Sequence, residues 1–347
     1  MASSSPYSLD FILLLLLPVY VVAQSYQNIT LGSSLTAALN INSSWKSPSG
    51  DFAFGFQQIR TGEFLLAIWF DKIPQKTIIW SAYGEKLVQE GSKIQLTTDG
   101  QFSLSDTRGE EVWTAQLTGS GVVSYAAMLD TGNFVLSSQD SIFLWESFNL
   151  PTDTIVPAQI MIKGSGLFSR YAEMNYSRGK FTFQMQVDGN LVLYGTNFPL
   201  HTGTSAYWAT MTVNQGFQFV FNQSGYIYLE DQNGSTLYYM TSNGAPSSRD
   251  YYQRAILEYD GVFRHYVYPK INDATTKSPM NWSVRSFEPE NICRRLEESQ
   301  GSGPCGFNSY CSLGDDQRPR CDCPPGYSFF DPNDKMRGCK QDFISQD

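Results

Sequence analysis

Histidine is nearly absent from this sequence of 347 residues, which contains only His201 and His265. The two lie far apart in the chain, so the sequence offers no histidine-based catalytic triad and no histidine metal cluster. Basic residues are scattered, with 24 Lys and Arg against 33 Asp and Glu and a net charge of −9. Because phosphate binding needs concentrated positive charge, nucleic acid is excluded as a partner. We expect a binding protein that is not an enzyme and has no cofactor or metal.

Long hydrophobic runs are absent after the N-terminus. The one run there, Phe11–Leu17 followed by Val21, Val22 and Ala23, is too short to span a bilayer comfortably and ends in a small residue. It predicts a secretory signal peptide over residues 1–23. Because no Lys or Arg precedes the run, an uncleaved anchor is the alternative. We expect no other membrane segment in the chain.

Glycosylation signals agree with secretion. One Asn-x-Ser/Thr triplet arises easily by chance, but several behind a signal peptide predict an extracellular glycoprotein. The triplets begin at Asn28, Asn42, Asn175, Asn222, Asn233 and Asn281.

Cysteine is absent from the first 292 residues, and all six cysteines lie between Cys293 and Cys339. The first part of the chain must therefore be held by buried apolar surface, whereas the last part is small and is expected to be cross-linked. Spacing alone leaves the pairing open. Zinc is the other use of clustered cysteines, but an oxidising compartment favours disulfides.

Helical periodicity is absent beyond the signal peptide, and a short glycine-centred phrase recurs instead. Each copy predicts a tight turn that needs glycine and leads into a strand with alternating apolar residues. Three units per domain, taken twice, indicate an all-β chain with domains at 24–150 and 151–286, a module at 287–340 and a tail at 341–347. A β-sandwich with regular turns is the alternative. The copies are centred on Gly50, Gly100, Gly132, Gly189, Gly225 and Gly261.

The copy at Gly189 carries a distinctive set of polar residues. Alternate residues of a strand share a face, so one face is expected to present hydrogen-bonding groups around a small apolar residue, and Val187, Leu191 and Leu193 are expected to face the core. Such a face suits a sugar ring, which presents hydroxyls around a C–H surface. The residues of the polar face are Gln186, Asp188, Asn190, Val192 and Tyr194.

This pattern, Gln-x-Asp-x-Asn-x-Val-x-Tyr, resembles the mannose-binding motif of monocot bulb lectins at every specified position. The resemblance implies a three-fold β-prism fold in both domains. It also implies that Gln186, Asp188, Asn190 and Tyr194 hydrogen-bond mannose hydroxyls while Val192 packs on the ring. The simpler interpretation is that Asp-Gly-Asn is only a turn and the residues after it only a strand.

The other five copies lack this set, so we expect one competent site per chain, which would bind a monosaccharide weakly and rely on multivalency. Asn222 stands where Gln186 stands in the intact copy, and a glycan attached to it would cover that face. In the second domain, the corresponding positions are Asn222, Ser224, Tyr226, Tyr228 and Glu230, and Glu258, Asp260, Val262, Arg264 and Tyr266.

A second resemblance extends over nearly the whole chain. Trp69-Phe70, Ile79-Trp80-Ser81 and the segments 128–136 and 144–154 are similar to the ectodomains of plant G-type lectin S-receptor-like serine/threonine kinases. Relatives continue with a membrane helix and a kinase, whereas this sequence ends at Asp347. We therefore expect a fragment, a truncated product or a soluble form, located in the apoplast or, in a full-length receptor, at the plasma membrane.

The cysteine segment resembles the EGF-like part of these receptors. Cys321-Asp-Cys323 with Gly326-Tyr327 carries the resemblance. The pairing that it implies is Cys293–Cys311, Cys305–Cys321 and Cys323–Cys339.

Two functions from different classes remain open. The first is recognition of a mannose-containing glycan or glycoprotein, with a homodimer or a co-receptor as a further partner. The alternative is a protein-recognition or dimerisation ectodomain that has lost sugar binding. The copies that lack the polar residues favour lost sugar binding in the first domain. The complete set at Gly189 favours sugar binding in the second domain.

Overall fold

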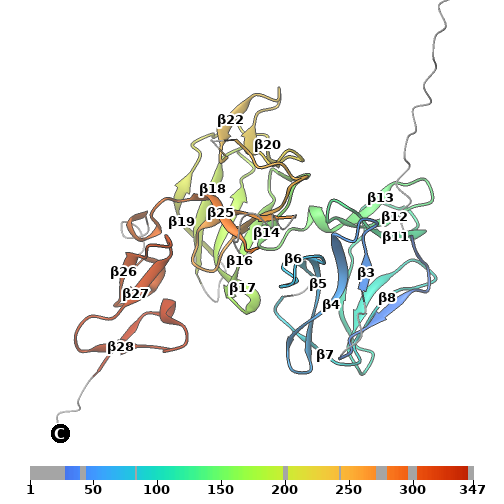
Figure 1. Ribbon diagram of the computed structural model, residues 1–347, viewed down its shortest axis with the longest axis horizontal. Coiled ribbons are helices and arrows are strands. Elements are labelled where there is room, and N and C mark those ends of the chain that lie inside the picture. Colours follow the sequence, from blue (N-terminus) through green and yellow to red (C-terminus); the bar gives the residue numbers. More distant parts are fainter. Residues whose placement is uncertain are drawn as a thin grey trace, which may run out of the picture.

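The computed structural model describes residues 28–39, 44–82, 84–197, 202–241, 244–270, 280–295 and 303–342. Two β-rich bodies follow one another along the chain, and a smaller module, red in Figure 1, lies beside the second. The predicted signal peptide, Asn42 and His201 lie outside the described residues.

The six recurring glycines adopt one turn. Each has a positive φ, between +73° and +90°, and each donates its N–H to the carbonyl three residues earlier at 2.8–3.1 Å. Only glycine occupies this conformation without a steric penalty. The sequence repeat is therefore a repeat of hairpins, and each turn connects two consecutive, paired strands of one antiparallel sheet.

The first body is a prism of three antiparallel sheets. One sheet contains β1 (Ile29–Thr30), β11 (Tyr125–Met128), β12 (Phe134–Ser137) and β13 (Phe143–Glu146). The next contains β2 (Ser34–Thr36), β8 (Lys93–Leu96), β9 (Phe102–Ser105) and β10 (Glu111–Thr114). The third contains β3 (Ser44–Lys46), β4 (Phe52–Arg60), β5 (Glu63–Phe70) and β6 (Ile78–Ser81), with β7 (Val88–Gln89) paired to β5.

The second body repeats this arrangement after the short helix η1 (Ser147–Asn149). Its first sheet contains β14 (Thr154–Ile155), β23 (Tyr251–Leu257), β24 (Phe263–Pro269) and β25 (Ser283–Glu288). The next contains β15 (Gln159–Ile162), β20 (Gln218–Phe221), β21 (Ile227–Glu230) and β22 (Thr236–Tyr239). The last contains β16 (Gly166–Ala172), β17 (Asn175–Met185), β18 (Leu191–Asn197) and β19 (Thr202–Ala209). The chain is thus all-β with two tandem three-fold prisms; the domain limits given above remain our proposal.

Phenylalanine fills the centre of each prism. In the first, Phe54 and Phe134 stack at 4.1 Å, and Phe102 lies 5.5 Å from Phe134. In the second, Phe183 stacks on Phe263 at 4.3 Å and meets Phe219 at 5.3 Å. Each of the three sheets of a prism contributes one ring. The prisms therefore have a three-fold aromatic core and contain no disulfide between their sheets among the described residues.

Tryptophan also adds to the first core. Trp80, Trp113 and Trp145 pack edge to face, 5.8–6.2 Å apart. Trp69 is also buried, but it belongs to a separate cluster on the other face of its sheet, against which Tyr176 of the second prism packs. This cluster therefore forms part of the contact between the prisms.

The C-terminal module contains η2 (Gly303–Cys305), β26 (Tyr310–Leu313), β27 (Pro319–Asp322), β28 (Tyr327–Phe329), η3 (Lys335–Arg337) and β29 (Cys339–Gln341). Its disulfides are Cys293–Cys311, Cys305–Cys321 and Cys323–Cys339, the pairs that the EGF-like resemblance implies. Cys293 and Ile292 belong to the core of the second prism, so the module is continuous with that prism.

Candidate carbohydrate-binding site

A closed turn between β17 and β18 forms the first half of the site. The Gln186 N–H donates to the Asn190 carbonyl at 2.9 Å, and the Gly189 N–H donates to the Gln186 carbonyl at 3.0 Å. A Cβ on Gly189 would lie 2.4 Å from the Gly216 carbonyl oxygen, so no larger residue fits here. The strand begins only at Leu191. The sequence-based expectation of one continuous strand from Gln186 is therefore wrong.

Because of this turn, the side chain of one residue predicted to face the core is exposed to solvent. Val187 is 80% exposed, not buried, because it lies in the turn, where strand alternation does not apply. Leu191 and Leu193 lie on β18 and are fully buried, as predicted. The predicted burial thus holds for the two leucines on the strand and fails for the residue in the turn.

Asp188 and Asn190 are fixed by hydrogen bonds. Asp188 Oδ1 accepts from the Asn190 N–H at 2.9 Å. Asn190 Oδ1 accepts from the Thr212 N–H at 3.1 Å and from the Thr210 hydroxyl at 3.3 Å. Within the described part of the chain, Asp188 Oδ2 and Asn190 Nδ2 make no hydrogen bond, which leaves one acceptor and one donor for a ligand.

Tyr194 and Gln186 complete the polar groups. The Tyr194 hydroxyl donates to Gln184 Oε1 at 2.7 Å, so its oxygen is left to accept from a ligand. The half-buried Gln186 amide has no hydrogen-bond partner among the residues that the structure describes. The strand thus orients Tyr194 through Gln184, a residue that the motif does not include.

Val192 differs from expectation. It is 2% exposed, and the sheet register places it between Gln184 of β17 and Ala209 of β19. It therefore offers a ligand almost no apolar surface in this conformation. Recognition of a sugar here would rest on the polar groups, as in a shallow, weak site.

The repeat centred on Gly261 forms a buried ion-pair network in place of a sugar-binding face. Arg264, 1% exposed, contacts Glu258 at 2.6 Å and Asp260 at 2.8 Å. Arg318 of the C-terminal module contacts Glu258 at 2.7 Å, and its guanidinium donates to the Tyr266 hydroxyl at 3.0 Å. The positions that would form a sugar site on this sheet instead hold the module in place, a role that sequence comparison of the copies did not indicate.

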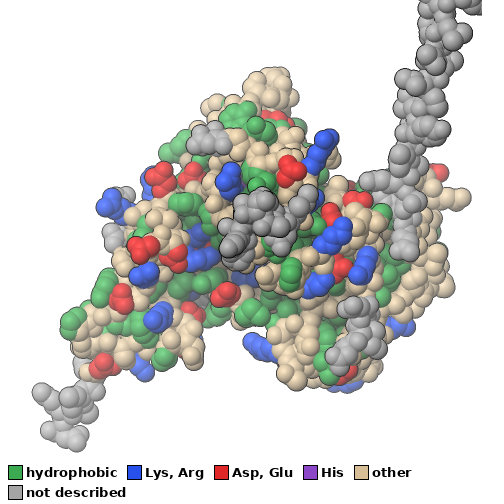
Figure 2. Space-filling model, viewed as in Figure 1, with side chains coloured by type: hydrophobic (Ala, Val, Ile, Leu, Met, Phe, Trp, Pro, Cys, Tyr) green, Lys and Arg blue, Asp and Glu red, His purple; other side chains and the backbone are tan. Residues whose placement is uncertain are grey.

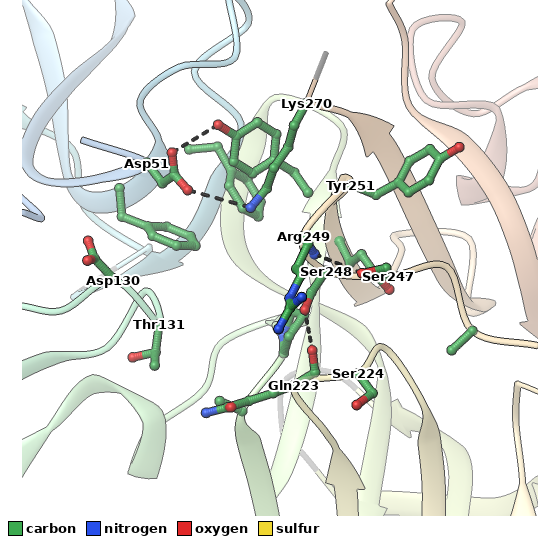
Figure 3. A pocket seen from close by; sticks show the side chains of 17 residues that line it. Asp51, Asp130, Thr131, Gln223, Ser224, Ser247, Ser248, Arg249, Tyr251 and Lys270 are labelled. Atoms are coloured by element: carbon green, nitrogen blue, oxygen red, sulfur yellow. Dashed lines mark hydrogen bonds and ion pairs between the residues drawn. The ribbon is translucent and has the colours of Figure 1, made fainter. Parts of the chain in front are cut away.

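A cavity of about 650 Å³ lies between the two prisms, and no residue of the β17–β18 hairpin lines it. Figure 3 shows its lining side chains. The Asp51 carboxylate lies at its edge. It accepts a hydrogen bond from the Tyr252 hydroxyl at 3.0 Å and pairs with Lys270 of the second prism at 3.6 Å. Burial and this carboxylate raise the pKa of Tyr252, so its hydroxyl remains a donor. Beside it, the Phe70 ring lies 5.3 Å from Tyr252.

We expect Asp51→Ala to loosen the contact between the prisms by about 1–3 kcal/mol, since it removes charge-assisted bonds that join them. Small-angle scattering should show a larger radius of gyration and a broader distance distribution. Asp106→Ala is the matched control, because Asp106 pairs with Arg108 and accepts the Arg108 N–H at 2.9 Å inside the first prism. Identical scattering from both variants would contradict a joining role for Asp51.

The described residues contain neither a metal cluster nor a membrane-spanning helix. No group of His, Cys, Asp and Glu side chains in the described ranges is arranged to hold a metal ion. None of the helices in those ranges is long and apolar enough to cross a membrane.

The chain is similar to a known domain family and to plant receptor kinases. A family model described as D-mannose binding lectin matches residues 77–166. A G-type lectin S-receptor-like serine/threonine-protein kinase of Oryza sativa subsp. indica is 45% identical over 350 residues. A second such kinase, from Arabidopsis thaliana, is 37% identical over 369 residues. The first match covers 97% of this chain and 42% of the rice protein, and the second covers 100% and 43%.

Two lectins are among the solved structures to which parts of the chain are similar. The mannose-specific agglutinin of snowdrop, Galanthus nivalis, complexed with methyl-alpha-D-mannoside, is 19% identical with a TM-score of 0.26, and the match covers 37% of this chain and 98% of that one. Tarin lectin bound to trimannose is 21% identical with a TM-score of 0.26, and covers 35% and 94%. We describe the two bodies as prisms because each has three antiparallel sheets, and not because of these similarities.

Proposed function

This chain belongs to the family of G-type lectin S-receptor-like serine/threonine-protein kinases, and from this premise we propose that it is an extracellular module that binds a mannose-type glycan. Its residues cover the lectin part of such a protein and contain no kinase domain. The chain spans about two fifths of the length of these relatives, so signalling by a complete receptor is part of the proposal.

The observation that carries the proposal is the arrangement at the β17–β18 hairpin. Asp188 and Asn190 are immobilised by the turn and by Thr210 and Thr212, yet each keeps one polar atom without a hydrogen bond to another described residue. Tyr194 presents a hydroxyl oxygen on the strand that follows. Fixed acceptors and donors along one edge match the hydroxyls of a hexose and lose little entropy on binding.

The test combines Asp188→Asn with Tyr194→Phe. Asparagine keeps Oδ1 as the acceptor for the turn and replaces Oδ2, while phenylalanine keeps the ring and removes the hydroxyl. We expect at least a tenfold loss of binding, about 1.4 kcal/mol or more, because each change removes a hydrogen bond to the sugar. The measurement is binding to an array of high-mannose glycans at high protein density.

The control is Asp99→Asn, a change at the corresponding turn of the first prism, where we expect no effect on binding. Thermal unfolding of both variants checks that the fold is retained. Absence of binding by the unaltered protein, or equal binding by the double variant, would contradict the proposal and favour a scaffold that recognises another protein.

A further inference from the structure

One sheet of the second prism exposes an apolar row. The register aligns Ile160, Val220, Tyr228 and Tyr239 across β15, β20, β21 and β22. Ile160 is 45% exposed and Tyr239 55%, and Ile162, next on β15, is 63% exposed. Figure 2 shows hydrophobic surface at the top of this prism, where Figure 1 labels β20 and β22. Val220, in the middle of the row, is only 7% exposed, so the exposed apolar side chains lie at the two edges of the sheet, on β15 and on β22 beside the half-buried Tyr228. Apolar groups gathered in this way at a surface indicate that something covers them.

The two tyrosines give the row an aromatic centre. The rings of Tyr228 and Tyr239 lie 6.0 Å apart at 48°. Their tilted pair presents ring faces, and ring faces accept the C–H surface of a sugar while leaving its hydroxyls in water. The row lies on a different sheet from the β17–β18 hairpin, so its occupant need not be the ligand of that site.

Asn222 begins the turn that leads into this face. Its Oδ1 accepts from the Ser224 N–H and the Tyr226 N–H, both at 3.0 Å. These bonds fix the side chain through Oδ1, and Nδ2, the atom to which an N-linked glycan is attached, takes no part in them. Gln223 and Ser224, which complete the glycosylation triplet, are exposed.

Tyr228 lies beside this amide. Burial raises the pKa of the Tyr228 hydroxyl, and a hydrogen bond with the Asn222 side chain acts in the opposite direction. A glycan on Nδ2 would therefore start next to the Tyr228 ring, with Tyr239 directly across the strand pair.

We propose that Asn222 carries an N-linked glycan whose first N-acetylglucosamine units lie over Tyr228 and Tyr239. The chain's own glycan then covers the two tyrosines and occupies the degenerate binding face of this sheet. Protein and glycan stabilise each other, and the hairpin at β18 is left as the face open to foreign glycans.

The experiment uses the secreted glycoprotein and starts with glycopeptide mass spectrometry at Asn222. Ser224→Ala then removes the glycan while keeping the Asn222 side chain. We expect the melting temperature of the second prism to fall by about 3 °C, a typical response to the loss of one packed surface group. In a Tyr239→Ser background the same change should shift it by less than about 1 °C. Tyr239 is exposed, so its replacement should not prevent folding.

Two controls separate the contact from other effects. When both are produced in cells that attach no N-glycans, the Ser224→Ala variant and the unaltered protein should melt at the same temperature. In the glycosylated protein, Asn28→Gln should remove a glycan without the tyrosine-dependent shift. Nitration of Tyr239 should also rise when the Asn222 glycan is absent. An unoccupied Asn222, or an equal shift in both Tyr239 backgrounds, would overturn the proposal without affecting the test at β18.

Discussion

Replacing Arg264 by methionine is expected to destabilise the second prism by about 3–5 kcal/mol and to release the C-terminal module. Arg264 is 1% exposed and holds two carboxylates, at 2.6 Å from Glu258 and 2.8 Å from Asp260. Without the guanidinium, both carboxylates would remain in the interior with only Arg318 nearby. An uncompensated buried charge is among the most destabilising features that one substitution can create.

The protonation of the two carboxylates supports this view. Burial disfavours the charged form of Glu258, but Arg264 and Arg318 outweigh burial and lower its pKa. Burial raises the pKa of Asp260 in spite of Arg264. Asp260 is thus the carboxylate whose charge depends most on Arg264, and it should take up a proton in the variant. Asp260→Asn added to Arg264→Met should therefore recover part of the lost stability.

Hydrogen exchange followed by mass spectrometry can measure this effect in the intact chain. Peptides from β23 and β24 report opening of the sheet, and peptides from β26 and β27 report release of the module. Arg318→Met is the graded comparison, with a smaller loss expected because Arg318 is 35% exposed and stabilises the same carboxylates from the module side. Arg108→Met, on an exposed surface pair, is the neutral control. Unchanged exchange in Arg264→Met would refute the stabilising role of the network.

The repeated glycine turn made most of this fold predictable from sequence. The turn requires a positive φ, and glycine is the residue that tolerates it, so six similar phrases predicted six similar hairpins. The apolar residues after each turn then specified inward-facing strands, and the strands form three sheets in each body. These features depend on the backbone preference of glycine and on the spacing of apolar residues, and both can be read directly from a sequence.

The site was only partly predictable, because its details depend on neighbours that are distant in sequence. The motif placed Asp188 and Asn190 together, but not their anchoring by Thr210 and Thr212 from the following strand connection. It did not indicate that Val192 is covered. The conversion of the Gly261 copy into a docking surface depends on Arg318, which belongs to another module. Periodicity along one strand carries no information about such partners.

Acidification from pH 7 to pH 4 is expected to remove about 3 kcal/mol of stability from the second prism through His265 alone. His265 is fully buried on β24, and burial, with Arg285 nearby, lowers its pKa to about 4. One ring nitrogen, Nε2, lies 2.9 Å from Gln253 Oε1, while Nδ1 is buried without a hydrogen-bond partner in the described part of the chain. A second proton on the ring would therefore be unsatisfied and charged in the interior.

The direction of the effect follows from proton binding. Below its ordinary pKa of about 6.5, His265 is protonated in the unfolded chain but stays neutral in the folded one until about pH 4. The unfolded state thus binds more protons over this window, and stability falls as the pH falls through it. His265→Gln removes this titration, so its stability should change less between pH 7 and pH 4. The measurement is the opening free energy of β23 and β24 from hydrogen exchange at each pH. Because all other titrating groups are shared, the difference between the two curves isolates His265, and parallel curves would show that it keeps an ordinary pKa.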